Sequence, residues 1–276
     1  MIIVVAHYNT YRKSPYNNTW QDTLFKCLKR FPNTKKIVVD WGSTDGSNIP
    51  LEEICYREKC DYKNIKINEK KFNWFDYAYK WKETVLDNIK KENILYLEAD
   101  SYLCGDEDQL LKAEDILKNN DDVGLVKMTR LCNYGIHPHY VDKQINNGFI
   151  LHNFEYCKKY IDFTIGETNL LSPSRSIRSC WHNWDIKCTV FRTSYLSSSI
   201  EELNRSESHR KDKKRGYYNL GLFFCNKYRS AIGDYIFSYN YGVRNLDYSK
   251  SMSICDKYHN EKIMNICENS IINYRK

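Results

Sequence analysis

The order of strand and helix patterns in this chain predicts an α/β fold, a three-layer α/β/α sandwich around a mostly parallel central sheet. Residues 2–6 (IIVVA) form a wholly apolar, largely β-branched run. Residues 36–40 (KIVVD) and 94–97 (ILYL) are two further apolar runs, and helical patterns separate the three. Strands that are buried on both faces and joined by helical crossovers are typical of parallel sheets.

The elements around these strands alternate regularly through the first half of the chain. Apolar residues recur at helical spacing in three segments, and the pair Pro32-Asn33 ends the first of them. The sequence GSTDG that follows the second strand is a turn. We therefore expect helices at residues 19–31, 49–58 and 75–89, and a short strand at residues 65–67.

The second half of the chain is less regular, and residues 133–180 are expected to form loops with small elements. No repeat or Gly/Ser linker marks a domain boundary, and residues 243–276 are expected to form a helical C-terminal extension. The remaining pattern predicts helices at residues 109–119, from 197 to 203 and at 218–228, and strands at residues 123–128, 187–192 and 231–239.

The composition is that of a soluble globular protein. Of the 276 residues, 42% are hydrophobic and 14% aromatic, which supplies a large core and excludes disorder for most of the chain. The 42 Lys and Arg residues outnumber the 35 Asp and Glu residues, and the net charge of +7 suits an anionic ligand. Because no basic stripe is interleaved with aromatic residues, nucleic acid is not an expected partner.

The cysteines and the opening segment point to a reducing compartment. All 11 cysteines occur without a CxxC pair, unlike a disulfide scaffold or a zinc site, and we expect free thiols. The first apolar run is too short for a signal sequence, and none approaches the ~20 residues of a membrane span. The sequence therefore predicts a soluble, cytoplasmic protein with no transmembrane segment.

Polar residues stand at the carboxyl ends of three predicted strands: Tyr8, Asp40, and the pair Glu98 and Asp100. Ligands of such sheets bind at this edge. Two carboxylates two residues apart suit a divalent metal that bridges to a diphosphate. In the alternative interpretation Glu98 and Asp100 are solvated residues at a strand–loop junction, and Asp40 caps the turn that Gly42 begins.

Several segments resemble family 2 glycosyltransferases with the GT-A fold. KKIVVDWGSTDGS is similar to their VVDDGSTDGS segment, IIVVAHYNT to their first strand, and ILYLEADSYL to the FLDADD segment that carries the DXD motif. EKKFNWFDYAYKWKE stands where such enzymes often carry an FNRSxAxN-like segment. These likenesses cover residues 1–103, and CTVFRTSYL and AIGDYIFSYNYG extend the resemblance to about residue 242.

The resemblance implies a domain organisation and an activity. Residues 1–242 would form the GT-A domain, with residues 1–130 as the nucleotide-sugar-binding half and residues 131–242 as the acceptor-binding half. The implied reaction moves a hexosyl or pentosyl group from a UDP-, GDP- or dTDP-linked donor to a hydroxyl of a glycan or glycoconjugate, with inversion. Ala6, His7 and Tyr8 would line the nucleobase pocket. Asp40 would hold the base, because a carboxylate accepts from a nucleobase N–H.

The resemblance also implies a metal, Mn²⁺ or Mg²⁺. Asp100 matches the last Asp of the DXD motif and would be a ligand, and Glu98 occupies the first position of that motif. Both residues would also contact the donor. Glu98 is one methylene longer than the Asp of the family, and Asn240 stands where many relatives have His.

The catalytic base of an inverting transferase is a carboxylate that takes the acceptor proton. Glu207 is a candidate by its position in SESHRKDKKR, and Asp185 is a candidate by its setting beside Trp181 and Trp184. For each, a solvated surface charge is the alternative. The basic residues 209–215 are either a solvated face or a clamp for the diphosphate.

Two other functions stay open on the sequence. One is a catalytically inactive GT-A-like protein that binds carbohydrate or nucleotide. The other is a sugar nucleotidyltransferase, which would need a glycine-rich phosphate loop after the first strand, where AHYNTYRKSPYNN has no glycine. His137 and His139 are expected to be ordinary loop histidines, because the HPH spacing does not direct both rings to one ion.

Overall fold

The structure is a computed structural model. It describes residues 1–8, 24, 27, 29–44, 46–66, 74–98, 101–103, 105–128, 141–145, 149–152, 188–206, 220–221, 224, 227–233 and 238–240.

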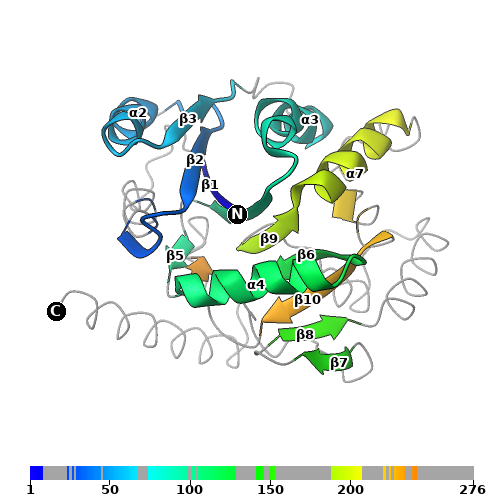
Figure 1. The fold of residues 1–276 in the computed structure, drawn as a ribbon. Helices are drawn as coiled ribbons and strands as arrows, with labels where there is room; N and C mark the ends of the chain where they lie inside the picture. The colour runs from blue at the N-terminus through cyan, green and yellow to red at the C-terminus, as the bar shows by residue number, and fades with distance from the viewer. Residues whose placement is uncertain are drawn as a thin grey trace, which may run out of the picture.

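A nine-stranded mixed sheet forms the centre of the described part, with strand order β3-β2-β1-β4-β9-β6-β10-β8-β7 (Figure 1). All of its strands except β8 and β9 run in one direction. A separate two-stranded sheet pairs β5 with β11. The strands are β1 (Ile2–His7), β2 (Lys35–Asp40), β3 (Asp61–Asn64), β4 (Asn93–Glu98), β5 (Ser101–Leu103), β6 (Val123–Lys127), β7 (Val141–Ile145), β8 (Phe149–His152), β9 (Thr189–Arg192), β10 (Arg229–Gly233) and β11 (Ser238–Asn240).

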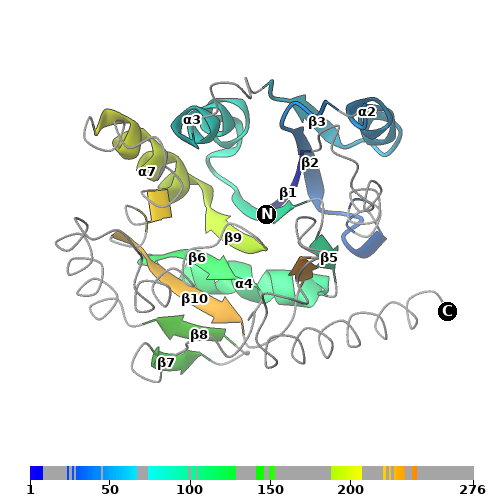
Figure 2. The same cartoon turned by 180° about the vertical axis from the view of Figure 1, so that it is seen from behind.

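Helices cover both faces of the main sheet (Figures 1 and 2). Two core clusters show which helix packs where: α2 and α4 share one cluster with the sheet, and α3 and α7 share the other. The predicted α/β class and its three layers are therefore confirmed. The helices are α2 (Asn48–Arg57), α3 (Trp74–Thr84), the 3-10 helix η2 (Leu86–Ile89), α4 (Glu107–Asn119) and α7 (Thr193–Arg205).

Strand β1 shows why the sequence forms a central strand. Ile3 and Val5 lie in the cluster on the α2 and α4 side, and Ile2 and Val4 lie in the cluster on the α3 and α7 side. Since successive side chains of a strand point to opposite faces, a continuous apolar run fills both layers. Each such side chain contributes about 1.5–3 kcal/mol when fully buried.

Several predicted boundaries are wrong, for identifiable reasons. The strand predicted at residues 65–67 is β3, at Asp61–Asn64, an edge strand held by its backbone pairing with β2 and largely exposed. The helix predicted at residues 75–89 is interrupted after Thr84 and continues as η2. The strand predicted at residues 231–239 is two strands, β10 and β11, which belong to different sheets.

The hairpin of β7 and β8 lies within residues 133–180, the segment predicted to be loops with small elements. Its strands are four and five residues long, too short for a clear apolar alternation. The dipeptide Asn147-Gly148 between them is the signal that predicts a hairpin.

Some predictions fall largely or wholly outside the described residues. Of the helix predicted at residues 19–31, the described Leu24, Cys27, Lys29 and Arg30 are helical. The extension at residues 243–276 lies outside the described part, and the division into donor and acceptor halves stays a prediction.

The cysteines that the structure describes are free, as predicted: Cys27, Cys55, Cys60 and Cys188. Burial raises the pKa of the Cys55 thiol to about 12, so this thiol stays protonated at neutral pH. Among the described residues, no helix has the length and hydropathy to cross a bilayer.

Candidate functional site

The carboxyl ends of β1, β2 and β4 lie side by side, and they bring predicted site residues together. In the strand register His7 is opposite Asp40, and Ala6 is opposite Glu98. The chain leaving β2 stays close to β1, because the Trp41 N–H donates to the His7 carbonyl at 2.9 Å. These residues therefore occupy neighbouring positions at one edge of the sheet, where ligands of α/β folds bind.

Asp40 is a fully buried carboxylate, with an exposed fraction of 0%. Ser43 supplies its hydrogen bonds: the backbone N–H lies 3.3 Å from each carboxylate oxygen, and the hydroxyl donates to Oδ1 at 2.5 Å. Among the described residues, no cation lies within ion-pair distance of Asp40. Burying a charge is costly without such a partner. The turn-capping role considered for Asp40 is thus observed, and it fixes the carboxylate.

The glycine turn after β2 makes this geometry possible. Gly42 has φ +80° and Gly46 has φ +84°, a backbone region that favours glycine. The turn directs the Ser43 N–H back toward Asp40 and leads into α2.

His7 is tied to the start of α2. It is 3% exposed, and its Nε2 lies 2.8 Å from the Ser47 hydroxyl. Ser47 is the N-cap residue of α2, yet its side chain makes no capping hydrogen bond. Such a capping bond typically contributes about 1 kcal/mol. The helix loses this contribution, and the hydroxyl instead joins the glycine turn to β1.

An aromatic group lies on the other face of the sheet. The ring of Trp41 stacks on Tyr77 of α3 with 3.7 Å between centroids, and Trp81 meets Tyr96 of β4 edge to face. Burial raises the pKa of Tyr77, a side-chain hydrogen bond with Tyr96 lowers it, and the charge of Glu98 raises it further. Tyr77 is therefore a neutral phenol, and it lies close enough to Glu98 for that charge to affect its pKa.

The predicted donor residues divide between the two faces of the sheet. His7 and Asp40 continue the alternation that places Val5 and Val38 on the α2 and α4 side. Ala6 packs on the α3 and α7 side, and Glu98 follows Tyr96 to that side. A ligand that contacts both Asp40 and Glu98 must therefore lie across the edge of the sheet.

Tyr8 and Glu98 are the more accessible members of the group. Tyr8 directly follows β1 and is 46% exposed, as a residue that lines an open pocket would be. Glu98 is half-buried at the end of β4.

Three predicted residues lie outside the described part: Asp100, Asp185 and Glu207. The backbone nevertheless gives one relation, because β5 and β11 pair antiparallel with Asn240 opposite Ser101. Asn240 is thereby brought beside the residue that follows Asp100. The role of Asn240 itself stays a prediction.

The described residues alone do not form a metal site. No group of three His, Cys, Asp or Glu side chains gathers among them. Glu98 offers one carboxylate, and a hard divalent cation takes six or more oxygen ligands. The metal therefore stays a prediction that depends on Asp100.

Sequence reasoning missed Ser43 and Ser47 as residues of this site. Their signal is present, because both flank the glycines of the GSTDGS segment. A serine there reaches the strand end by a short local hydrogen bond.

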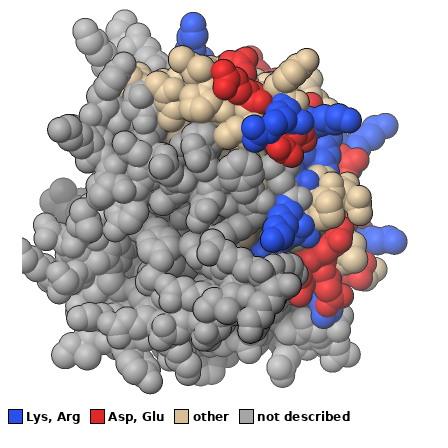
Figure 3. Space-filling view, turned by 90° about the vertical axis from the view of Figure 1, so that its left-hand side faces the viewer, with Lys and Arg blue, Asp and Glu red and all other residues tan. Residues whose placement is uncertain are grey.

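A hollow of about 400 Å³ lies at the opposite edge of the sheet and is separate from these residues. It lies where β1 and β2 begin, and its lining includes Thr34, Lys35, Glu92, Glu107, Leu110 and Glu114. On the face shown in Figure 3, the described basic and acidic side chains are intermixed and form no patch of one sign.

Comparisons with known proteins give structural likenesses at low identity. No protein-family model matches the chain, and no curated protein matches it in sequence. The chain is similar to Staphylococcus aureus TarS 1–349 in complex with UDP-GlcNAc, at 16% identity and a TM-score of 0.48, over 99% of this chain and 66% of that one. It spans 39% of a longer TarS chain.

Two further solved structures are similar to parts of the chain. One is the mannose-1-phosphate geranyltransferase of Thermus thermophilus, at 11% identity, over 84% of this chain and 72% of that one, with a TM-score of 0.43. The other is the glycosyltransferase GlyE of Streptococcus pneumoniae, at 19% identity, over 64% of this chain and 41% of that one, with a TM-score of 0.32.

Proposed function

We propose that this protein is a glycosyltransferase that moves a sugar from a nucleotide-diphosphate donor to a hydroxyl of a glycan or glycoconjugate. The observation that carries the proposal is Asp40: a fully buried carboxylate at the carboxyl end of β2, hydrogen-bonded by Ser43 and without a cationic partner among the described residues. Such a group is costly for folding, and a binding role accounts for its retention.

Asp40 supports recognition of the nucleobase. An ionised carboxylate has about four acceptor positions, and the Ser43 hydrogen bonds occupy only part of them. The rest can accept from an imide or amide N–H of a base. Because Ser43 already orients the carboxylate, less conformational freedom is lost when the base binds.

The transfer itself needs groups beyond the base pocket. The bond between the sugar C1 and the diphosphate oxygen breaks with its electron pair going to the diphosphate. The acceptor oxygen bonds to C1, and its proton passes to a carboxylate base. Glu207 and Asp185 remain the proposed bases, and inversion rests on the sequence resemblance. Mn²⁺ or Mg²⁺ on Asp100 and Glu98 would offset the charge of the diphosphate.

The test is turnover of UDP-, GDP- and dTDP-linked sugars with and without MnCl₂, read as release of the nucleoside diphosphate. We expect one nucleotide class to be hydrolysed slowly without acceptor. Asp40→Asn should lose turnover of that class, and Asp61→Asn, at the opposite edge of the sheet, should retain it.

A second candidate function is a binding protein that keeps the fold without catalysis. Glu98 in place of Asp and Asn240 in place of His favour it. Binding of one nucleotide sugar with turnover of none, with or without metal, would establish this alternative and overturn the transferase.

A further inference from the structure

A row of three side chains crosses the sheet near its carboxyl edge. Tyr96 of β4 is opposite Thr189 of β9, and Thr189 is opposite Lys127 of β6. Residues directly opposite in antiparallel strands share a face. Tyr96 packs in the cluster with α3 and α7, so all three side chains lie on that face.

Lys127 is the charged member of this row, and it is buried, with an exposed fraction of 5%. It is the last residue of β6, and β6 runs in the same direction as β4. Lys127 and Glu98 therefore both stand at the carboxyl end of a strand, on the same edge of the sheet. Glu98 lies two positions beyond Tyr96, on the same face.

The other buried lysines of the described part have different settings. Lys36, near the start of β2, donates to the carbonyls of Phe31 and Thr34. Lys82 of α3 is 2.9 Å from both Asp87 and Glu201. Lys36 lies near the start of its strand and Lys82 lies on a helix, whereas Lys127 is the last residue of its strand, at the carboxyl edge.

We propose that Lys127 binds the diphosphate of the donor and stabilises it as the leaving group. This inference rests on the proposed function and names a further residue for the same site. A lysine ammonium has three donors and acts as a point charge toward phosphate. In a buried setting, its attraction to an anion is stronger than in water.

The charge on the diphosphate grows as its bond to C1 breaks, so a fixed cation there contributes more to the transition state than to the bound donor. Lys127 keeps its proton throughout, because the acceptor proton goes to the carboxylate base. Lys127 lies on β6, two strands from β4, and Asp40 lies on β2, two strands from β4 on its other side. The base and the diphosphate would thus be bound at separate points of one edge.

The test is calorimetric titration of wild-type protein, Lys127→Met, Lys127→Arg and the matched control Lys36→Met with UDP, UMP and inorganic pyrophosphate, with and without MnCl₂. GDP with GMP, or dTDP with dTMP, replaces the uridine pair if the donor panel selects another base. We expect Lys127→Met to weaken binding of the diphosphates about 10- to 100-fold and to leave the monophosphate unchanged. Lys127→Arg should restore part of the loss, and Lys36→Met should bind all three as wild type does.

The inference is overturned if Lys127→Met binds pyrophosphate and the nucleoside diphosphate as tightly as wild type does. Turnover of the donor by the wild-type protein would in that case leave the proposed function standing. Conversely, diphosphate binding that depends on Lys127, with no donor turned over, would support Lys127 and remove the transferase. If Lys127→Met does not fold, wild-type protein with ¹⁵N-labelled lysine decides. Its Lys127 ammonium resonance, assigned through Lys127→Arg, must shift with pyrophosphate, and a fixed resonance at saturation overturns the inference.

Discussion

The two edges of the central sheet treat charge in opposite ways. The amino edge holds ion pairs, such as Lys35 with Asp61 at 2.9 Å and Arg229 with Asp122 at 2.9 Å. At the carboxyl edge Asp40 is completely buried and is held by the neutral Ser43. The ion pairs at the amino edge neutralise side-chain charges that contribute to stability alone. Serine at the carboxyl edge orients the Asp40 charge without neutralising it, as the proposed binding of a nucleobase requires.

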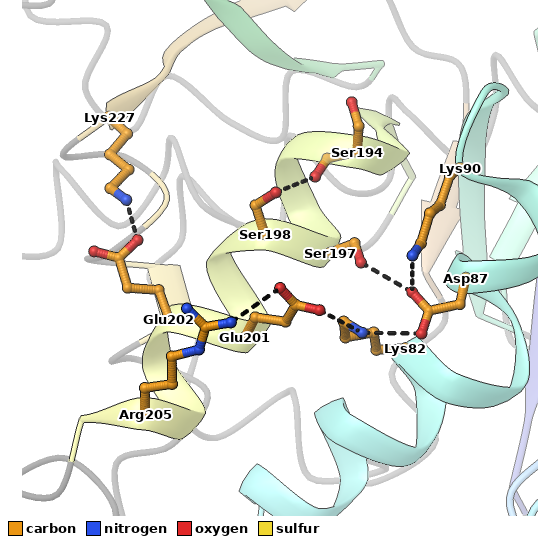
Figure 4. Close-up of polar contacts among 10 residues, drawn as sticks. All are labelled: Lys82, Asp87, Lys90, Ser194, Ser197, Ser198, Glu201, Glu202, Arg205 and Lys227. Carbon is orange, nitrogen blue, oxygen red and sulfur yellow. Dashed lines mark hydrogen bonds and ion pairs between the residues drawn. The ribbon is translucent and has the colours of Figure 1, made fainter.

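In the helix layer beside the amino edge, charged side chains also form ion pairs (Figure 4). The Lys82 ammonium bridges Asp87 of η2 and Glu201 of α7, and the Ser197 hydroxyl lies 3.2 Å from Asp87. Lys90 adds a second cation at 3.3 Å from Asp87. This network ties α3, η2 and α7 together with every charge compensated.

Asp40→Asn gives the largest expected effect. It removes the charge but keeps one oxygen for Ser43, so binding and turnover of the donor should fall about 100-fold while the free energy of unfolding does not fall. Donor titration and urea unfolding measure the two quantities. A loss of stability that accounts for the loss of turnover would make Asp40 a structural residue and erase the difference between the edges.

Lys82→Met should affect stability alone. The substitution leaves Asp87 and Glu201 beside a methionine, although Lys90 and Arg205 still compensate part of their charge. We expect a decrease of about 1–2 kcal/mol in the free energy of unfolding and unchanged donor binding. Lys112→Met, which removes an exposed pair within α4, is the matched control and should leave the urea midpoint unchanged. Weaker donor binding in Lys82→Met would contradict the separation of the two edges.

Gly46→Ala tests the turn that carries Ser43 and Ser47. No atom lies within 4 Å of an added Cβ, so the effect comes from the positive φ of this residue alone. We expect a loss of about 1 kcal/mol in the free energy of unfolding. Gly124→Ala is the contrasting variant, because its Cβ would lie 2.6 Å from the Cβ of Tyr228. If Gly124→Ala were no more destabilising than Gly46→Ala, the close packing of Gly124 against Tyr228 would be wrong.

The pH dependence of the Lys82 network is the smallest expected effect. Burial raises the pKa of Asp87, but hydrogen bonds from Lys82 and Lys90 outweigh it and hold the pKa below its ordinary 3.8. The hydrogen bond from Lys82 lowers the pKa of Glu201 below 4.5. Burial lowers the pKa of Lys82, and bonds from both carboxylates raise it above 10.5.

The signs follow from linkage. The lowered carboxyl pKa values contribute stability that is present above pH 4.5 and is lost as the pH falls through the folded-state values. The raised lysine pKa contributes stability that is lost as the pH rises above 10.5. The stability difference between wild type and Lys82→Met should therefore shrink at pH 3 relative to pH 7. Urea unfolding at both pH values measures it, and a constant difference would show that packing, not charge, holds the three helices.

The sequence predicts the strands that are buried on both faces well and the edge strand β3 poorly. β1 and β2 are continuous β-branched runs, and only a strand buried on both faces favours such a run. β3 (DYKN) lacks that pattern, because an edge strand is held by its backbone bonds to β2. The strands of the hairpin of β7 and β8 were not predicted because they are too short for a clear apolar alternation.

Some residues of the candidate site could be predicted from the sequence, and others could not. Asp40 and Glu98 could be located from the strand ends, since strand order alone brings them to one edge. The use of the Ser47 hydroxyl by His7 could not, because a serine before a helix predicts a cap. Lys127 was also missed, because burial of a lysine depends on neighbouring strands that its own segment does not specify.

The pairing of β5 with β11 has a consequence for the order in which the candidate site is assembled. It joins Ser101 to Asn240, positions far apart in the chain, and it does so next to Asp100. Contacts between distant segments form late in folding, since the entropy of closing the loop must be overcome before the contact adds stability. We therefore expect β1, β2 and β4 to be in place before this small sheet closes, so that a partly synthesised chain would hold the strand ends but lack the completed site.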